Sequence, residues 1–210
     1  PNPSEAIVFW KWLSPQNIAV VTTTNLYNWN ISSPDSSPVL ITSKNQLLNS
    51  CQIINVTANQ EMSWFAINGI FQENGKIAGK IQLFSKARNI SQIIDGHVSG
   101  FSQLKLSGAV SPSTLFIIGN RNPTTGAGNM HIIEIDHNPS NPTYSKKNID
   151  IFFPADASND FPISCQVSEN YGIVYILTKY GFIHLFDLET GLNLFVNRIS
   201  ADPLFTASSH

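Results

Sequence analysis

Residues 171–191 read YGIVYILTKYGFIHLFDLETG, and this stretch decides the fold. Two runs within it, Ile173–Thr178 and Phe182–Leu188, are rich in β-branched and aromatic residues and carry no helix-capping signal, so each predicts a β-strand. Gly181 lies between the two runs and Gly191 follows the second. We expect both glycines to adopt a positive φ, which tight turns between antiparallel strands require.

Similar runs flank this pair of strands. Pro162–Ser168 precedes it and Asn193–Ile199 follows it, each joined by a short turn. Consecutive strands joined by short turns pair with one another, so this region predicts one four-stranded antiparallel sheet. Comparable sets of four strands recur at intervals of about 45 to 60 residues, the repeat length of β-propeller blades. The predicted blades span residues 6–45, 50–95, 99–154 and 161–200, with the start of a further blade at 201–210.

The fold class predicted from this pattern is all-β, a β-propeller of four-stranded antiparallel blades. Propellers close with about four to eight blades, so four blades predict either a small closed ring or an arc of a larger one. The chain begins at Pro1 without a Met and ends soon after a new apolar run at Leu204, which favours the arc. We expect an arc to expose two sheet faces and to be less stable than a complete ring.

The composition is typical of a chain with a large core. Of the 210 residues, 42% are hydrophobic and 12% charged, and the formal net charge is −2. The basic residues are scattered rather than clustered, which argues against a nucleic-acid partner. No apolar run reaches the roughly 20 residues that a membrane-spanning helix needs. We therefore expect any membrane association to be indirect.

Cys51 and Cys165 are the two cysteines, and both fall within predicted strands. We predict buried thiols in a reducing, cytosolic compartment, with a disulfide as the alternative. Three glycosylation triplets, at Asn30, Asn55 and Asn89, point the other way. Such triplets arise by chance in Asn- and Ser-rich sequence, and Asn55 lies within a strand pattern, so the cytosolic prediction is kept.

Residues that could carry chemistry are sparse. His131, Asp136 and His137 match no zinc spacing, and the acidic turn 156–160 lacks the glycine and glutamate of a calcium loop. The Gly-x-Gly within residues 125–128 is not followed by the helix that a phosphate site needs. We predict no catalytic residue, no metal and no cofactor.

The first two predicted blades hold a cluster of large aromatic side chains. Such residues pack in blade cores more often than they form binding sites. We therefore predict core positions for them, with one exposed residue as the alternative. The cluster comprises Phe9, Trp10, Trp12, Trp29 and Trp64.

Many unbroken strings resemble the N-terminal propeller domain of the clathrin heavy chain, and QENGKIAG at 72–79 resembles its fungal branch. Together the strings extend over nearly the whole chain. The others are FWKW at 9–12, CQIIN at 51–55, IDGH at 94–97, HIIE at 131–134, DIFFP at 150–154, NDFP at 159–162, TKYGFIHL at 178–185, DLETG at 187–191 and NRIS at 197–200.

This resemblance implies the middle blades of a seven-bladed propeller within a vesicle coat. It implies a non-catalytic module that binds short linear motifs of adaptor proteins. The implied location is the cytoplasmic face of coated pits and coated vesicles at the plasma membrane, trans-Golgi and endosomes. The clathrin light chain and the heavy-chain trimer would be partners through other parts of a heavy chain.

The resemblance also implies two peptide sites on these residues. A groove for a Leu-rich, arrestin-type loop would be formed by a set that we call the groove set: Trp64, Leu83, Arg88, Ile90 and Gln92. A site for a Trp-containing motif at the top of the central channel would use the channel set: Gln52, Ile54 and Ile70. The site for the clathrin-box motif would lie largely upstream of Pro1.

Residue types alone favour structural or solvent-exposed roles, rather than binding roles, for several of these positions. By that reasoning Leu83, Ile54 and Ile70 are core residues and Arg88 is a solvated turn charge. The sequence leaves two candidate functions open. One is a structural and peptide-binding module of the coat; the other is a propeller-fold hydrolase, which would need converging carboxylates, histidines or a metal at the central channel.

Overall fold

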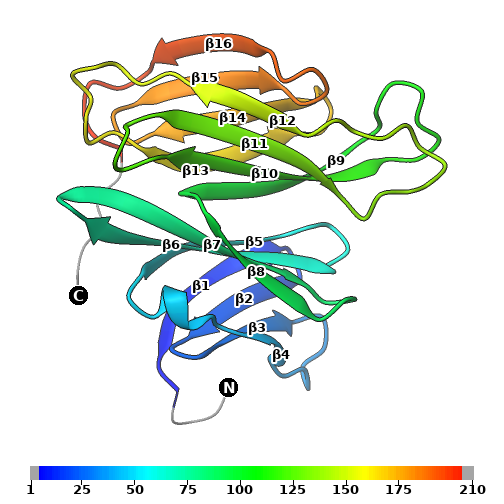
Figure 1. Cartoon of the computed structure of the whole chain (residues 1–210). Helices are drawn as coiled ribbons and strands as arrows, with labels where there is room; N and C mark the ends of the chain where they lie inside the picture. The colour runs from blue at the N-terminus through cyan, green and yellow to red at the C-terminus, as the bar shows by residue number, and fades with distance from the viewer. Residues whose placement is uncertain (1–4, 205–210) are drawn as a thin grey trace. The chain divides into compact units, whose positions relative to one another are not determined.

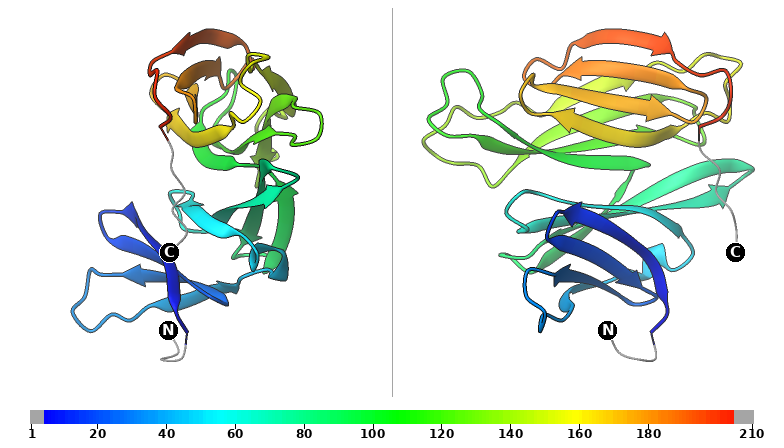
Figure 2. Two further views of the ribbon diagram at one scale, coloured as in Figure 1. Left: turned by 90° about the vertical axis from the view of Figure 1, so that its left-hand side faces the viewer. Right: turned by 180° about the vertical axis from the view of Figure 1, so that it is seen from behind.

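A computed structural model of the chain describes residues 5–204. In this range the strands form four four-stranded antiparallel sheets, and within each sheet the strands pair in chain order (Figure 1, Figure 2). Such a meander is the topology of a propeller blade. The predicted fold class is confirmed. Residues 205–210, the greater part of the predicted further blade, lie outside the described residues.

The sheets are numbered here in chain order. Sheet 1 consists of β1 (Ile7–Ser14), β2 (Asn17–Thr22), β3 (Asn25–Asn30) and β4 (Val39–Ser43). Sheet 2 consists of β5 (Gln52–Ala58), β6 (Trp64–Glu73), β7 (Lys76–Ser85) and β8 (Ile90–Asp95). Sheet 3 consists of β9 (Val98–Leu104), β10 (Ser113–Arg121), β11 (Gly128–Ile135) and β12 (Lys147–Ile151). Sheet 4 consists of β13 (Pro162–Ser168), β14 (Ile173–Thr178), β15 (Phe182–Asp187) and β16 (Asn193–Arg198). The short 3₁₀ helix η1 (Gln46–Leu48) links sheets 1 and 2.

The chain divides into two compact units. The first, Pro1–Phe71 with Gly79–Asp95, holds sheet 1 and most of sheet 2. The second, Gln72–Ala78 with Gly96–His210, holds sheets 3 and 4 and the tip of the β6–β7 hairpin. Each unit has a hydrophobic core of its own.

The core of the first unit forms between sheets 1 and 2. Phe65 and Ile67, two residues apart on β6, are both buried and join Val21 and Leu26 of sheet 1 in one cluster. Leu48 of η1 is fully buried in the same cluster. Because alternate residues of a strand share a face, the period of two in β6 directs one apolar row to this core. The linking turn thus helps to hold sheet 2 against sheet 1.

Two hydrogen bonds reinforce the larger core of the second unit. There the buried hydroxyl of Tyr144 donates to the carbonyl of Leu188 at 2.6 Å. The carboxylate of Glu189 accepts a bond from the backbone N–H of Ser107 at 2.8 Å. Both bonds join the turn after β15 to loops of sheet 3, so sheets 3 and 4 are fixed by polar contacts as well as by apolar packing.

Residues 171–191 form β14, β15 and the turns that follow them. Gly181 has φ +83° and Gly191 has φ +79°, as predicted. A Cβ atom at Gly181 would lie 2.6 Å from the carbonyl oxygen of Ser200. This turn therefore needs glycine both for its backbone conformation and for the close approach of the chain.

The prediction that the aromatic cluster is blade core is wrong for three tryptophans, Trp10, Trp12 and Trp29. Trp10 is 61% exposed and Trp12 48% exposed, whereas Phe9 packs against the core of the first unit. The strand period explains the difference, because Phe9 lies on the core face of β1 and both tryptophans lie on the opposite face. Trp29 is also 36% exposed, and Trp64 is buried.

The first strand of sheet 3 starts one residue before the third predicted blade. β9 starts at Val98, and Ser99 pairs with Ile118 in the ladder. Ser99 and Gly100 carry little strand propensity. The ladder with a buried neighbouring strand extends β9 against local preference.

Apolar side chains are exposed on outer parts of both units. On sheet 1 they include Val39 and Leu40 of β4, and on sheet 4 Leu194 and Phe195 of β16.

No helix in residues 5–204 has the length and apolar character needed to cross a membrane.

Candidate functional site

The groove set gathers at one end of sheet 2. Leu83 on β7 pairs with Gln92 on β8, and Ser85 pairs with Ile90 two positions nearer the connecting turn. Paired residues share a sheet face, as do residues two apart along a strand. Leu83, Ile90 and Gln92 therefore lie on one face, and Arg88 lies in the turn that joins their strands.

Trp64 is held beside this turn by hydrogen bonds that involve the connection between β5 and β6. The buried Asn59 side chain accepts a hydrogen bond from the backbone N–H of Trp64 at 2.8 Å, and Lys86 N–H donates to the carbonyl of Ser63 at 2.8 Å. The guanidinium of Arg88 then lies 5.9 Å from the centroid of the Trp64 ring, within range of a cation–π contact. All five residues of the groove set are thus brought together within the first unit.

The members of the groove set differ in exposure. Ile90 is 52% exposed, and Arg88 and Gln92 are exposed beside it. Trp64 and Leu83 are only 8% and 4% exposed. The surface therefore presents a branched apolar side chain flanked by a cation and an amide, while Trp64 and Leu83 support it from below. An apolar anchor with adjacent hydrogen-bond donors is suited to a short peptide segment.

The channel set lies on two neighbouring strands of the same sheet. Gln52 on β5 pairs directly with Ile70 on β6, and the register shifts between Ile53 and Asn55, so Ile54 lies at a β-bulge. Gln52 is exposed, Ile54 half-buried and Ile70 buried. A bulge redirects the side chains of its strand, and the sequence carried no signal for it. Of this set, Gln52 offers the largest accessible surface.

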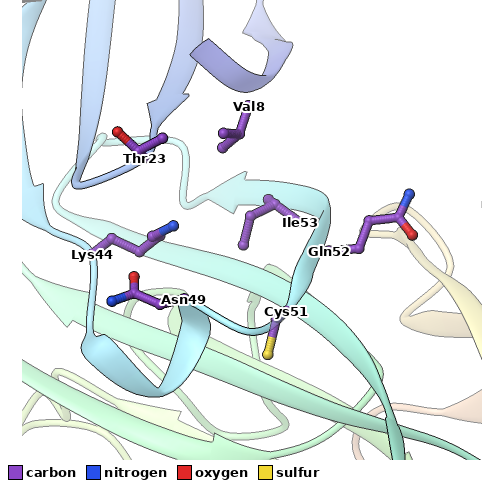
Figure 3. Close-up of a pocket in the computed structure, with 7 residues that line it drawn as sticks. All are labelled: Val8, Thr23, Lys44, Asn49, Cys51, Gln52 and Ile53. Atoms are coloured by element: carbon purple, nitrogen blue, oxygen red, sulfur yellow. The ribbon is translucent and has the colours of Figure 1, made fainter. Parts of the chain in front are cut away.

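A pocket that sequence reasoning missed lies between β1 and β5 of the first unit (Figure 3). Its volume is about 420 Å³, within the range of about 300–1,000 Å³ that is usual for ligand pockets. Both sheets of the unit contribute to it. The lining residues are Val8, Thr23, Lys44, Asn49, Cys51, Gln52 and Ile53. Only Gln52 among them belongs to a predicted site.

The pocket holds an amine and a thiol whose protonation is shifted by burial. Burial lowers the pKa of the Lys44 amine, because removal from water disfavours its charged form. Burial also raises the pKa of the Cys51 thiol, an effect that outweighs the opposing charges of Lys80 and Lys44. Cys51 is therefore a neutral thiol at neutral pH, which makes it a poor nucleophile.

Other candidates from the sequence have structural roles. In the acidic turn 156–160, the carboxylate of Asp160 accepts hydrogen bonds from the backbone N–H groups of Phe161 and Tyr180, both at 2.9 Å, and from the Thr178 hydroxyl at 2.8 Å. The carbonyl of Gly126 in the Gly-x-Gly loop accepts a bond from a buried guanidinium. These groups close turns of the second unit.

The histidine and cysteine candidates are also accounted for. His137 Nδ1 lies 2.9 Å from a carboxylate oxygen of Glu134. Within residues 5–204, no group of three or more His, Cys, Asp or Glu side chains could hold a metal ion. Cys51 and Cys165 are both free thiols, the first half-buried and the second buried.

Comparison with known proteins relates the chain to clathrin heavy chains. No protein-family model matches it. It is 39% identical over 208 residues to "Clathrin heavy chain 2" of Homo sapiens and 37% identical over 207 residues to "Probable clathrin heavy chain" of Schizosaccharomyces pombe. Each alignment covers 99% of this chain and 12% of the relative, so the chain spans about an eighth of the length of these relatives. The two identities do not favour the fungal relative, and the fungal assignment stays a prediction.

A solved structure with a similar arrangement of strands is the β-propeller domain of Cps50 (Swd1) from Myceliophteria thermophila. It is 10% identical, with a TM-score of 0.48, and the match covers 90% of this chain and 59% of that one. This likeness is too slight to carry an argument about function.

Proposed function

Because the chain is homologous, over 99% of its length, to a segment of the clathrin heavy chain, we propose that it is a non-catalytic structural and peptide-binding module of the clathrin coat. In this role it binds short linear motifs of adaptor proteins. The observation that carries the peptide-binding part is the gathering of Arg88, Ile90 and Gln92 on an exposed edge of sheet 2.

The chemistry of this edge suits a Leu-rich segment with an acidic flank. Ile90 is half-exposed and contacts the leucine side chain. The Arg88 guanidinium pairs with the acidic flank, and the Gln92 amide bonds to the peptide backbone. Trp64 supports Arg88 from below through the cation–π contact.

A second peptide contact is proposed at the channel set. Gln52 is the exposed polar member, and Ile54 and Ile70 supply apolar surface around the bulge. A Trp-containing motif combines a large apolar ring with one N–H donor, which complements an amide oxygen beside isoleucines. This assignment needs its own test, with a Trp-motif peptide and Gln52→Ala.

Attachment through such edges depends on many copies. A single motif bound at micromolar to millimolar affinity is worth only about 4 to 8 kcal/mol. Repeated modules on a coat raise the effective concentration of each motif and so convert weak contacts into stable attachment. We place the module at the cytoplasmic face of coated pits and vesicles, with the membrane reached only through adaptors, and with light-chain binding and trimerisation assigned to other parts of a heavy chain.

The test is a calorimetric titration of the purified protein with an arrestin-type, Leu-rich acidic peptide. We expect the double variant Arg88→Ala, Gln92→Ala to lose about 1 to 3 kcal/mol of binding free energy, the cost of removing charge-assisted hydrogen bonds. Lys86→Ala is the matched control, because Lys86 is an exposed cation in the same turn that lies outside the groove set. Equal binding by the double variant and the wild type would show that the peptide is bound elsewhere.

A further inference from the structure

The pocket between β1 and β5 contains a cation that no described carboxylate neutralises. Lys44 lies partly buried in its wall, and burial lowers its pKa. The carboxylate of Glu5, on the same unit, is instead bonded by the Thr22 hydroxyl at 2.7 Å and by the Asn25 amide at 3.0 Å. A partly desolvated ammonium group without an acidic partner is stabilised when an anion binds beside it.

The neighbours of Lys44 define the shape of the ligand. Figure 3 shows the ammonium end of Lys44 pointing into the pocket, with the side chain of Asn49 beside it. Ile53 also points into the pocket, and Val8 lies across from Lys44. Val8 is 46% exposed, so apolar surface is available next to the cation. The amide of Gln52 points away from Lys44.

One charge in the pocket favours a monoanion. Phosphate groups are usually held by several cations or by the fork of an arginine, whereas a lysine is a single point charge. The carbamoyl group of Asn49 lies beside that charge, and rotation of this amide by 180° would present its NH₂ as a neutral donor. A carboxylate matches both the charge and the donors.

We propose that this pocket binds a carboxylate that is attached to a small branched apolar group, with Lys44 and Asn49 on the anion and Val8 and Ile53 on the apolar part. Two peptide sources offer this chemistry: an apolar C-terminal residue, and an acidic side chain next to an apolar residue. The inference goes beyond the proposed function. The pocket shares one lining residue, Gln52, with the channel set, and Gln52 takes no part in the proposed binding.

The probes are N-acetylleucine and its uncharged analogue N-acetylleucinamide, titrated into the ¹⁵N-labelled protein and followed by NMR. We expect N-acetylleucine to shift the backbone amide signals of Val8, Asn49 and Ile53. The amide analogue should bind about tenfold to a hundredfold more weakly, because it lacks the charge-assisted bond. A third probe, N-acetyl-Glu-Leu-amide, carries an internal acid and a blocked C-terminus. Binding of either acid supports the proposal, and the tighter of the two identifies the source.

Variants make the test specific to Lys44. Lys44→Met keeps the apolar stem and should weaken N-acetylleucine binding by about tenfold or more, while Lys44→Arg should retain most of it. Lys86→Met, an exposed lysine outside the pocket, should change nothing. Unchanged signals elsewhere in the spectrum verify that each variant is folded.

Three outcomes would overturn the proposal: no pocket signal shifting with either acid, equal binding of N-acetylleucine and its amide, or equal binding by wild type and Lys44→Met. The titration with the Leu-rich peptide is run on the same Lys44→Met sample. If that peptide still binds while N-acetylleucine never did, only the pocket inference fails. If N-acetylleucine binds and the Leu-rich peptide does not, only the groove-set assignment fails.

Discussion

The two units use the same residue type for different purposes. In the second unit Arg121 is 9% exposed, and its guanidinium donates to the carbonyls of Ala157 and Asp160 and lies 4.3 Å from the Phe153 ring centroid. In the first unit Arg88 is exposed on a turn and contacts one aromatic ring. The guanidinium of Arg121 is buried, whereas that of Arg88 is exposed. Residue type alone therefore does not distinguish a buried structural arginine from an exposed one, and the structure does.

The largest effect predicted from this contrast is on stability. We expect Arg121→Met to lower the free energy of unfolding by about 3 to 5 kcal/mol, because it removes three hydrogen bonds from a buried guanidinium to backbone carbonyls together with a cation–π contact. Arg88→Met should change it by less than about 1 kcal/mol. Urea denaturation of both variants measures the difference. Similar losses from the two would end the contrast between a structural and a surface arginine.

A second difference between the units is a buried histidine in sheet 4, whose protonation depends on pH. His184 is fully buried, stacks near Phe186 with ring centroids 6.1 Å apart, and has no hydrogen-bond partner for either ring nitrogen among the described residues. Burial lowers its pKa to about 4, because the charged ring is disfavoured away from water. The first unit contains no histidine, since all five lie at position 97 or beyond.

The sign of the pH effect follows from this lowered pKa. The unfolded chain takes up a proton on His184 as the pH falls below about 6.5, whereas the folded chain does so only near pH 4. Stability from this group is therefore complete above pH 6.5 and is lost as the pH falls from 6.5 to 4, by about 3 kcal/mol in total. His184→Leu should remove that part of the pH dependence. Parallel curves of unfolding free energy against pH for wild type and variant would refute this role.

A smaller effect is expected at the hydrogen bond between Tyr144 and Leu188. The buried Tyr144 hydroxyl donates to the carbonyl of Leu188 at 2.6 Å. Tyr144→Phe keeps the ring and should cost about 1 to 2 kcal/mol of unfolding free energy, because it leaves that carbonyl without a donor. Tyr171→Phe is the control, since Tyr171 is 76% exposed. Thermal or urea denaturation decides, and equal stability of the two variants would contradict the prediction.

The smallest effect is predicted for the pocket lysine. Lys44→Met removes a charge that no described carboxylate balances, so it should change the unfolding free energy by less than about 0.5 kcal/mol. The binding loss described above would then be a loss of function without a loss of fold. A destabilisation of 2 kcal/mol or more would indicate that Lys44 is a structural residue, like Arg121.

The sequence carried enough information to predict the strands and their order. Apolar runs with glycine at the turns, as at Gly181, specify local pairing, and short connections leave few alternatives for the sheet. The position of Trp10 was mispredicted because composition does not tell which face of a strand has a neighbour. The bulge at Ile54 and the pairing of Ser99 and Gly100 within β9 depend on a neighbouring strand, and single-strand propensities do not encode that.

The candidate sites were predictable to different degrees. The groove set came from a family resemblance, and only the structure shows that Ile90 is exposed while Leu83 is buried. The pocket around Lys44 had no sequence signal, because its lining residues are separated along the chain. They come from β1, from the turn between β2 and β3, from the link between β4 and β5, and from β5 itself. Polar residues spread over such distances form a pattern only after folding.

The most direct test of the central claim is a crystal structure of the protein in complex with the Leu-rich acidic peptide. The account predicts a peptide leucine within about 4 Å of the Ile90 side chain and an acidic group within about 3 Å of the Arg88 guanidinium. A peptide bound on any other surface, with Arg88 and Gln92 still facing solvent, would contradict it.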